Sequence, residues 1–383
     1  MPVDRHQVVA FRLARHHLTK RLDPGGLRTA AATAPQNTPP GSAPLALRAR
    51  ADVNGVQVDQ AIANERSLLQ VWSLRGAPCI VATQELPLFT IGLLPDDEAS
   101  WRAALGGFLP VIDQLGRTAT EVMEMVIDAT HDALDGVVLT KRELGTALGR
   151  RMPEELAPWF EPDTFSAFSA ILTRAASLTG TVTIAPRSGA EASFVRTDQW
   201  LGRSVPSQSP SDVRAALVVR YLHLYGPSTV EDFAGWAGVA EPFARRAWSA
   251  VDDPLAEVDF AGRRCVVLAQ DIRALTSGTR PRGLRLLPPH EPYLQQRDRT
   301  TAVPDTTHHK RIWKHTGNPG VVLRDGEVTA LWRQQKKGRK LMLTIEPVTT
   351  LSTRDRTLIE AEAEPLAEFR GCAITEVGYG EVR

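Results

Sequence analysis

Apolar residues recur at spacings of three and four along several stretches of the chain, and these stretches predict amphipathic helices. Val122, Met125, Val126, Ala129 and Ala133, for example, occupy one helical face. The longest predicted helices cover residues 8–18, 118–134, 164–178, 213–224, 241–250 and 358–369. Shorter helices are expected at 45–50, at 84–89 and at 58–64, the last continuing through 67–72.

Short apolar runs bounded by Gly, Pro and Asp predict strands. They cover residues 79–82, 181–184, 193–196, 255–260, 263–268, 284–288, 321–323, 327–332, 341–345 and 372–377. Ala261-Gly262 and Asp325-Gly326 each separate two such runs, and Asp-Gly is a strong signal for a β-hairpin. Residues 278–283 read as a linker.

One order of elements occurs twice: a helix, a short capped helix, a third helix and a hairpin. In its first copy Thr140 and Glu143 have the spacing of a capping box. This order is that of a winged helix-turn-helix, and the N-terminal segment fits it less cleanly. We therefore expect an α+β protein with three tandem winged helix-turn-helix units, at 1–115, 116–206 and 207–277. Residues 278–383 are expected to form a small C-terminal β domain.

Composition sets limits on function. The 45 Lys and Arg residues nearly balance 44 Asp and Glu residues, so any DNA-binding face must be local. Cys79, Cys265 and Cys372 are too far apart in sequence for a metal motif, and they fit a reducing cytoplasm. No long apolar run predicts a membrane span, and no phosphate-binding loop, nucleotide fingerprint or Ser-His-Asp order appears. We expect neither a cofactor nor a metal.

Several basic positions are candidate DNA contacts. Lys141 and Arg142 lie at the short capped helix, although a solvated helix face is the simpler reading. His308, His309, Lys310 and Arg311 form the most basic cluster, and adjacent histidines do not make a metal pair on a helix. Lys336 and Lys337 lie at an expected hairpin tip, where a solubilising loop is an equal alternative. Glu291 or Asp298 is expected to form a buried ion pair with an arginine.

The loop Ala34-Pro35-Gln36-Asn37-Thr38-Pro39-Pro40-Gly41-Ser42 places two amides side by side. Asn-Thr-Pro-Pro-Gly is ordinary turn chemistry, so the pattern alone favours a surface turn. An amide can both donate and accept a hydrogen bond, and it can therefore orient a water molecule without carrying charge.

Blocks throughout the chain resemble the winged-helix family of bacterial DNA glycosylases that includes AlkZ and YcaQ. They are residues 13–18, 36–50, 72–78, 139–144, 286–288 with 292–294 and 297–299, 318–321 and 325–333. The resemblance implies a concave DNA-binding array of three winged helices and hydrolysis of the N-glycosidic bond of bulky alkylated purines. It also adds Arg75, inside block 72–78, to the candidate DNA contacts.

The family's catalytic signature is Gln, an apolar residue, then Gln or Asp. Here Ala34-Pro35-Gln36 stands over it, so the resemblance makes Gln36 and Asn37 the candidate catalytic residues and leaves no carboxylate. Alkylation at N7 makes guanine a cationic leaving group, and two amides that position water then suffice. The expected partner is double-stranded DNA with bulky alkylpurine adducts, bound by a cytoplasmic monomer. Self-resistance to a DNA-alkylating antibiotic and housekeeping repair both fit.

A non-catalytic winged-helix regulator or damage-recognition factor is the main alternative. The missing first glutamine and the absent carboxylate favour it. Regulators of this kind usually dimerise on palindromes, however, and the sequence shows no dimerising coiled coil. A drug-sequestering protein is a third option, for which the sequence offers no feature.

Overall fold

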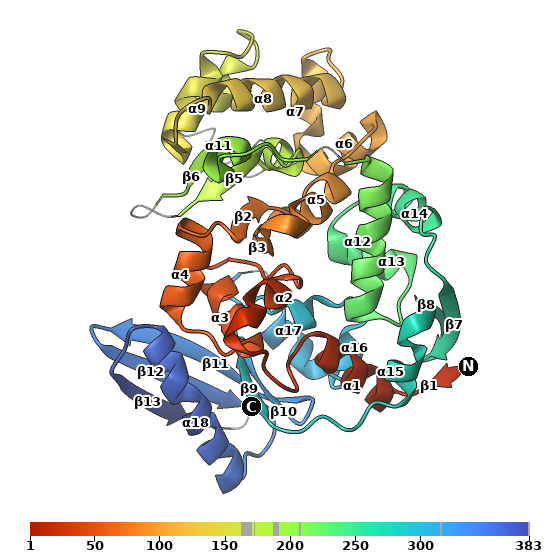
Figure 1. Cartoon of the computed structure of the whole chain (residues 1–383), viewed down its shortest axis with the longest axis vertical. Coiled ribbons are helices and arrows are strands. Elements are labelled where there is room, and N and C mark those ends of the chain that lie inside the picture. The colour runs from red at the N-terminus through yellow and green to blue at the C-terminus, as the bar shows by residue number, and fades with distance from the viewer. Residues whose placement is uncertain (162–170, 172, 187–190, 207, 315, 382–383) are drawn as a thin grey trace. The chain divides into compact units, whose positions relative to one another are not determined.

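The computed structural model describes residues 1–161, 171, 173–186, 191–206, 208–314 and 316–381. The chain forms two compact units that interleave along the sequence. Unit 1 comprises Met1–Gln60, Arg220–Asp232 and Asp253–Arg383, and unit 2 comprises Ala61–Val219 and Phe233–Asp252. Both mix helices with strands, as the α+β prediction requires (Figure 1). The count of three winged helices and the three predicted domain boundaries stay predictions.

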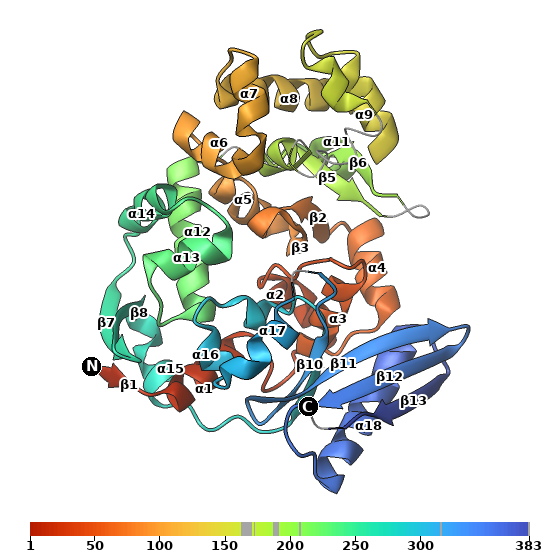
Figure 2. The ribbon, with the colours of Figure 1, turned by 180° about the vertical axis from the view of Figure 1, so that it is seen from behind.

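The C-terminal part of unit 1 is a five-stranded sheet in the order β13-β12-β11-β10-β9. Its strands are β9 (Leu284–Leu287), β10 (Gly320–Arg324), β11 (Glu327–Lys337), β12 (Lys340–Pro347) and β13 (Ile374–Tyr379). Only the pair β12–β13 is parallel within this sheet. Helix α18 (Thr353–Phe369) packs against β9, β12 and β13 and covers one face (Figure 2).

Alternation along β10 explains how this sheet has a core on both faces. Val322 joins the apolar cluster under α18, whereas Val321 and Leu323 join a second cluster on the opposite face. That second cluster is completed by residues from four helices of unit 1. They are α1 (Arg5–Arg15), α3 (Ser42–Arg50), α16 (Arg299–Ala302) and α17 (His309–Ile312). The sheet therefore supports α3, which begins directly after the loop with the two amides.

The rest of unit 1 is built around a smaller sheet. It contains β1 (Pro2–Val3), β7 (Leu255–Phe260) and β8 (Arg263–Leu268), with α15 (Ile272–Thr276) against α1. Ala261 and Gly262 both adopt positive φ, and so do Asp325 and Gly326 between β10 and β11. Both predicted hairpins are confirmed, because successive left-handed residues are what a tight two-residue β-turn requires. Helix α2 (Leu27–Ala31) precedes the loop with the two amides.

Unit 2 contains a second five-stranded sheet in the order β3-β2-β5-β6-β4. Its strands are β2 (Leu68–Trp72), β3 (Pro78–Ala82), β4 (Leu139–Thr140), β5 (Val182–Ala185) and β6 (Ser193–Arg196). Its helices are α5 (Leu86–Phe89), α6 (Glu98–Leu105), α7 (Leu109–Gln114), α8 (Ala119–Ala133), α9 (Lys141–Gly149), α11 (Thr197–Leu201) and α14 (Glu241–Ser249). Helices α4 (Gly55–Ala63), α12 (Pro210–Tyr225) and α13 (Val230–Ala237) each contain a boundary between the units.

Most predicted elements of unit 2 are present, one is wrong, and one lies mostly outside the described residues. The capping box is confirmed, because the Thr140 hydroxyl accepts from the Glu143 N–H while the Glu143 carboxylate accepts from the Thr140 N–H. The helical continuation over residues 67–72 is wrong, since Leu68–Trp72 is a strand paired on both sides. Most of the predicted helix 164–178 lies outside the described residues, and residues 171 and 173–178 are helical.

Two findings bear on the environment of the chain. In the part of the chain that the structure describes, no helix has the length and apolarity needed to cross a bilayer. The three cysteines are unpaired thiols, and all three are buried.

Candidate active site

The loop between α2 and α3 turns sharply at Ala34, the first position that aligns with the catalytic signature. This residue has φ of 46°, is only 4% exposed, and donates its N–H to the Ala31 carbonyl. A side chain at positive φ is unusual and strained. The turn places Pro35 in the interior, leaves Gln36 and Asn37 half-buried, and leads out to the exposed residues Thr38–Pro40.

Asn37 holds the loop against the start of α3. Its Oδ1 accepts hydrogen bonds from the Gly41 N–H at 2.8 Å and the Ala43 N–H at 3.4 Å. The first N–H groups of a helix have no partner inside the helix, and the N-cap residue here, Gly41, has no side chain to supply one. Asn37 therefore acts as a capping residue from four positions upstream, and its carbonyl oxygen is engaged.

Gln36 lies directly before this capping residue and differs from it. Among the residues that the structure describes, its side chain makes no hydrogen bond, although the residue is half-buried. A half-buried amide with both ends available can hold a water molecule by donating to it or accepting from it. The two candidate catalytic amides thus have different roles: Asn37 is tied to the backbone, and Gln36 is available.

The other end of α3 is fixed by a buried ion pair. The Arg50 guanidinium donates to Glu291 and to Nδ1 of His16, and all three side chains are fully buried. Arg50 also donates to the Ala46 carbonyl at 2.9 Å. A second pair joins Arg12 to Asp298 at 2.8 Å. The predicted buried ion pair is confirmed at both acidic residues.

His16 is a neutral member of this network. Burial lowers the pKa of His16 well below its usual value, and the neighbouring Arg50 lowers the pKa further. Because arginine can only donate, its contact with Nδ1 requires that nitrogen to be unprotonated. His16 therefore serves as a hydrogen-bond acceptor for Arg50 at neutral pH.

A groove of about 530 Å³ in unit 1 borders the loop. Thr38 and Pro39 form one side, and the other side is formed by the turns that flank β9 and β10 together with β11. The polar side chains on that side are His290, Asn318, Arg333 and Gln334. Asn318 and His290 face each other with Nδ2 and Nδ1 3.5 Å apart. The groove therefore combines a mostly apolar lining with four polar side chains, and it reaches the loop at Thr38 and Pro39, directly after the two amides.

These groove residues were not among the predicted site residues. Asn318-Pro319-Gly320 was part of a resemblance block, but no chemistry was assigned to it. The structure shows why Gly320 is needed there, since a Cβ at this position would lie 2.3 Å from the Trp332 indole. His290 has φ of 57°, which no local pattern indicates. The groove forms from four separate segments of the sequence, and the sequence alone did not reveal it.

The structure places the basic candidates of unit 1 on two features. His308–Arg311 form one turn at α17, where His308 lies 3.5 Å from Asp305 and His309 contacts the Val303 carbonyl. Lys310 is exposed, and Arg311 lies 3.7 Å from Glu346. Lys336 and Lys337 are exposed at the β11–β12 hairpin tip, as expected, and Lys336 donates to the Arg370 carbonyl.

The remaining candidates, Arg75, Lys141 and Arg142, belong to unit 2. Arg75 has φ of 53°, is half-buried and donates to the Trp236 carbonyl. Lys141 and Arg142 open α9, where Arg142 is exposed and Lys141 half-buried. Arg75 lies on a different element from the α9 pair. The described residues contain no group of three or more His, Cys, Asp or Glu side chains arranged to hold a metal ion.

Comparisons with known proteins agree on one family. Residues 29–369 match the family described as DNA glycosylase AlkZ-like. An interstrand DNA cross-link repair glycosylase of Streptomyces sahachiroi is 26% identical over 279 residues, which cover 70% of each chain. The solved structure of the Streptomyces sahachiroi DNA glycosylase AlkZ superposes with a TM-score of 0.79 at 22% identity, covering 99% of this chain and 100% of that one.

Proposed function

The chain belongs to the AlkZ-like DNA glycosylase family and is a hydrolase of N-glycosyl bonds, and we propose that it excises bulky N7-alkylated purines with Gln36 as the water-holding residue. The observation that supports this proposal is the arrangement of the loop that precedes α3. Its two amides have separate roles: Asn37 is fixed at the start of the helix, and Gln36 is available in a loop that borders a groove at Thr38 and Pro39.

The chemistry of a cationic base suits a loop without a carboxylate. Water adds to C1′ of the sugar as the C1′–N9 bond breaks, and the bonding electrons leave with the base. The released N7-alkylguanine becomes neutral, and the proton of the attacking water passes to solvent. The base needs no protonation, so the protein must mainly position the water and stabilise the charge that develops on the sugar. Gln36 positions the water, and Asn37 holds the loop in the conformation that Gln36 needs.

The size of the lesion is the finer part of the proposal. The relative from Streptomyces sahachiroi is named as a cross-link repair enzyme, and a large adduct does not fit the tight pocket used for flipped bases. We extend cross-link unhooking and self-resistance to an alkylating antibiotic to this chain as part of the same proposal. The three winged helices, the monomeric state and the cytoplasmic location belong to it too.

DNA contacts follow from charge. In unit 1, the exposed lysines at the β11–β12 tip and Lys310 in α17 would contact DNA phosphates. In unit 2, the exposed Arg142 would do the same. Phosphate contacts give affinity that falls steeply with salt. Arg75 has mainly a structural role in this proposal, because its guanidinium already donates to the Trp236 carbonyl.

The proposal is tested with a duplex that carries one bulky N7-alkylguanine at a defined position. After incubation with the full chain, hot alkali cleaves any abasic site. Strand breaks at that guanine that depend on the protein are the expected result. A duplex that stays intact, with DNA binding still measurable, contradicts the proposed substrate.

A further inference from the structure

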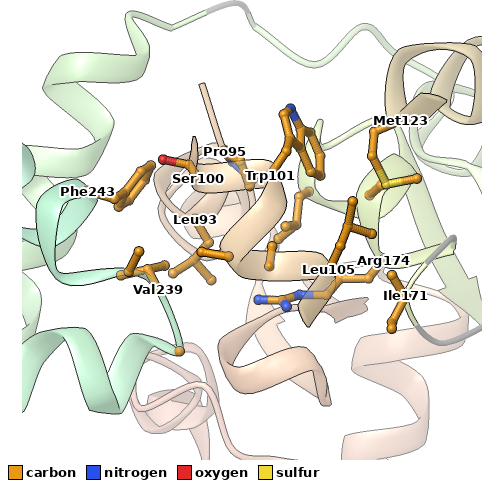
Figure 3. Close-up of a pocket in the computed structure, with 16 residues that line it drawn as sticks. Leu93, Pro95, Ser100, Trp101, Leu105, Met123, Ile171, Arg174, Val239 and Phe243 are labelled. Carbon is orange, nitrogen blue, oxygen red and sulfur yellow. The ribbon is translucent and has the colours of Figure 1, made fainter. Parts of the chain in front are cut away.

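Unit 2 contains a cavity of about 60 Å³ that takes no part in the chemistry above. Most of its wall is apolar and comes from the turn before α6, from α6 itself, and from α8 and the start of α14 (Figure 3). Trp101, Leu105, Met123 and Phe243 provide the larger side chains. A cavity needs about 10–15 Å³ for each water molecule, so this one has room for a ligand of about four to six heavy atoms.

One charged group lines this apolar space. Figure 3 shows the Arg174 side chain running along one edge of the group, below Leu93 and Leu105, so that it forms one wall of the cavity. Its Nε is buried without an acceptor, and no described carboxylate forms an ion pair with it. Arg174 as a whole is half-buried. A cation that is partly removed from water without a partner carries a free-energy cost, and this cost falls when an anion joins it.

The neighbours of Arg174 do not supply that anion. Burial lowers the pKa of Arg174 to about 10, so the guanidinium stays charged at neutral pH. Burial raises the pKa of the nearby Cys79 thiol to about 11, so that thiol stays neutral. The other close charged group is Arg75, whose positive charge adds to that of Arg174. The cavity is therefore an apolar pocket with excess positive charge at one wall.

We propose that this cavity is a binding site for a small organic carboxylate, with the carboxylate on Arg174 and a short apolar chain against Trp101 and Met123. A carboxylate matches the planar guanidinium with two parallel hydrogen bonds. A free phosphate fits less well, because the apolar walls would leave several of its oxygens without donors. The site lies wholly within unit 2 and does not depend on the proposed lesion or on Gln36.

The test measures binding and thermal unfolding of the full chain without DNA. Acetate, butyrate and hexanoate are titrated by calorimetry and thermal scanning, with butyramide as the neutral match for butyrate. Butyrate is expected to bind best and to raise the Tm of the chain by about 5 °C at a hundredfold excess over its Kd. Butyramide is expected to give less than one tenth of that affinity, because it lacks the charge.

Two variants separate binding from folding. Arg174→Met keeps the length of the side chain and removes the charge, so it should abolish the butyrate response while leaving the ligand-free Tm unchanged or higher. Ala104→Trp, at an exposed part of the lining, should block entry and abolish binding with Arg174 intact. The proposal is overturned if butyrate and butyramide act alike, if Arg174→Met still binds butyrate, or if no acid of the series binds the wild type.

Discussion

Arg50 in unit 1 is a fully buried arginine, Arg174 in unit 2 is a half-buried arginine whose Nε is buried, and the surroundings of the two are opposite. Arg50 donates to a carboxylate, a neutral histidine and a main-chain carbonyl. Arg174 has no carboxylate partner among the described residues, and an apolar cavity lies in front of it. The difference teaches that a fully partnered buried charge fixes a scaffold, whereas an unpartnered one marks a place for a ligand.

The partnered charge bears on the proposed chemistry through α3. Arg50 is the last residue of this helix, and its ion pair with Glu291 fixes that end. Asn37 caps the first turn at the other end. The loop that carries Gln36 is therefore held by a helix that is fixed at both ends. Catalytic groups need such support, because small displacements of a positioned water cost a large factor in rate.

The largest predicted effect comes from making Arg50 resemble Arg174. Glu291→Gln removes the carboxylate and leaves a buried guanidinium uncompensated, so the free energy of unfolding should fall by about 3–5 kcal/mol. Urea denaturation followed by fluorescence measures it. Glu327→Gln is the matched control, since that carboxylate is 46% exposed in its pair with Arg5 and should matter by less than about 1 kcal/mol. Equal effects of the two changes would contradict the comparison.

A smaller effect is predicted at the other end of α3. Asn37→Ala removes the acceptor for the Gly41 and Ala43 N–H groups and should lower the free energy of unfolding by about 0.5–2 kcal/mol. It should also slow excision, because the Gln36 loop loses its support. Asn37→Asp keeps an acceptor oxygen in the position of Oδ1 and should restore stability. An unchanged unfolding curve for Asn37→Ala would rule out the capping role.

The smallest predicted effect concerns pH and His16. The pKa of His16 is lowered in the folded protein, so the unfolded chain binds a proton more readily as pH falls below about 6.5. Above that pH, protonation of His16 does not affect the free energy of unfolding. Below it, protonation of His16 in the unfolded chain lowers the free energy of unfolding progressively. Comparing urea midpoints at pH 5 and pH 7.5, His16→Gln should lose less stability at pH 5 than the wild type. An equal loss of stability between pH 7.5 and pH 5 in the wild type and in His16→Gln would show that His16 does not cause this pH dependence.

Local signals allowed much of the fold to be predicted. The capping box at Thr140 and the two hairpin turns depend on residues close in sequence, and the structure has all of them. The segment Leu68–Trp72 was misassigned because neither the alternation of a half-buried strand nor a helical face is present in it. Leu68, Leu69 and Val71 are all buried, since this strand has neighbours on both edges.

The site was predictable only in part. An arginine partner for Glu291 and Asp298 was predictable, because burying an unpaired charge is costly. The identity of that arginine was not predictable, since Arg50 lies 241 residues from Glu291 in the sequence and only the fold brings the two together. The capping role of Asn37 depends on a backbone turn at Ala34 that no pattern indicates. The groove and the Arg174 cavity are each assembled from distant segments. The sequence could therefore indicate the loop, and the structure was needed to divide the duties of its two amides.

The most direct measurement is the single-turnover excision rate of Gln36→Ala on a duplex with one bulky N7-alkylguanine. Gln60→Ala, at an exposed position on α4, is the matched control. If Gln36 holds the attacking water, its loss should slow excision by about 100-fold or more, with DNA affinity unchanged. Gln60→Ala should keep the wild-type rate. A Gln36→Ala rate equal to that of the control would contradict the assignment of the loop as the catalytic one.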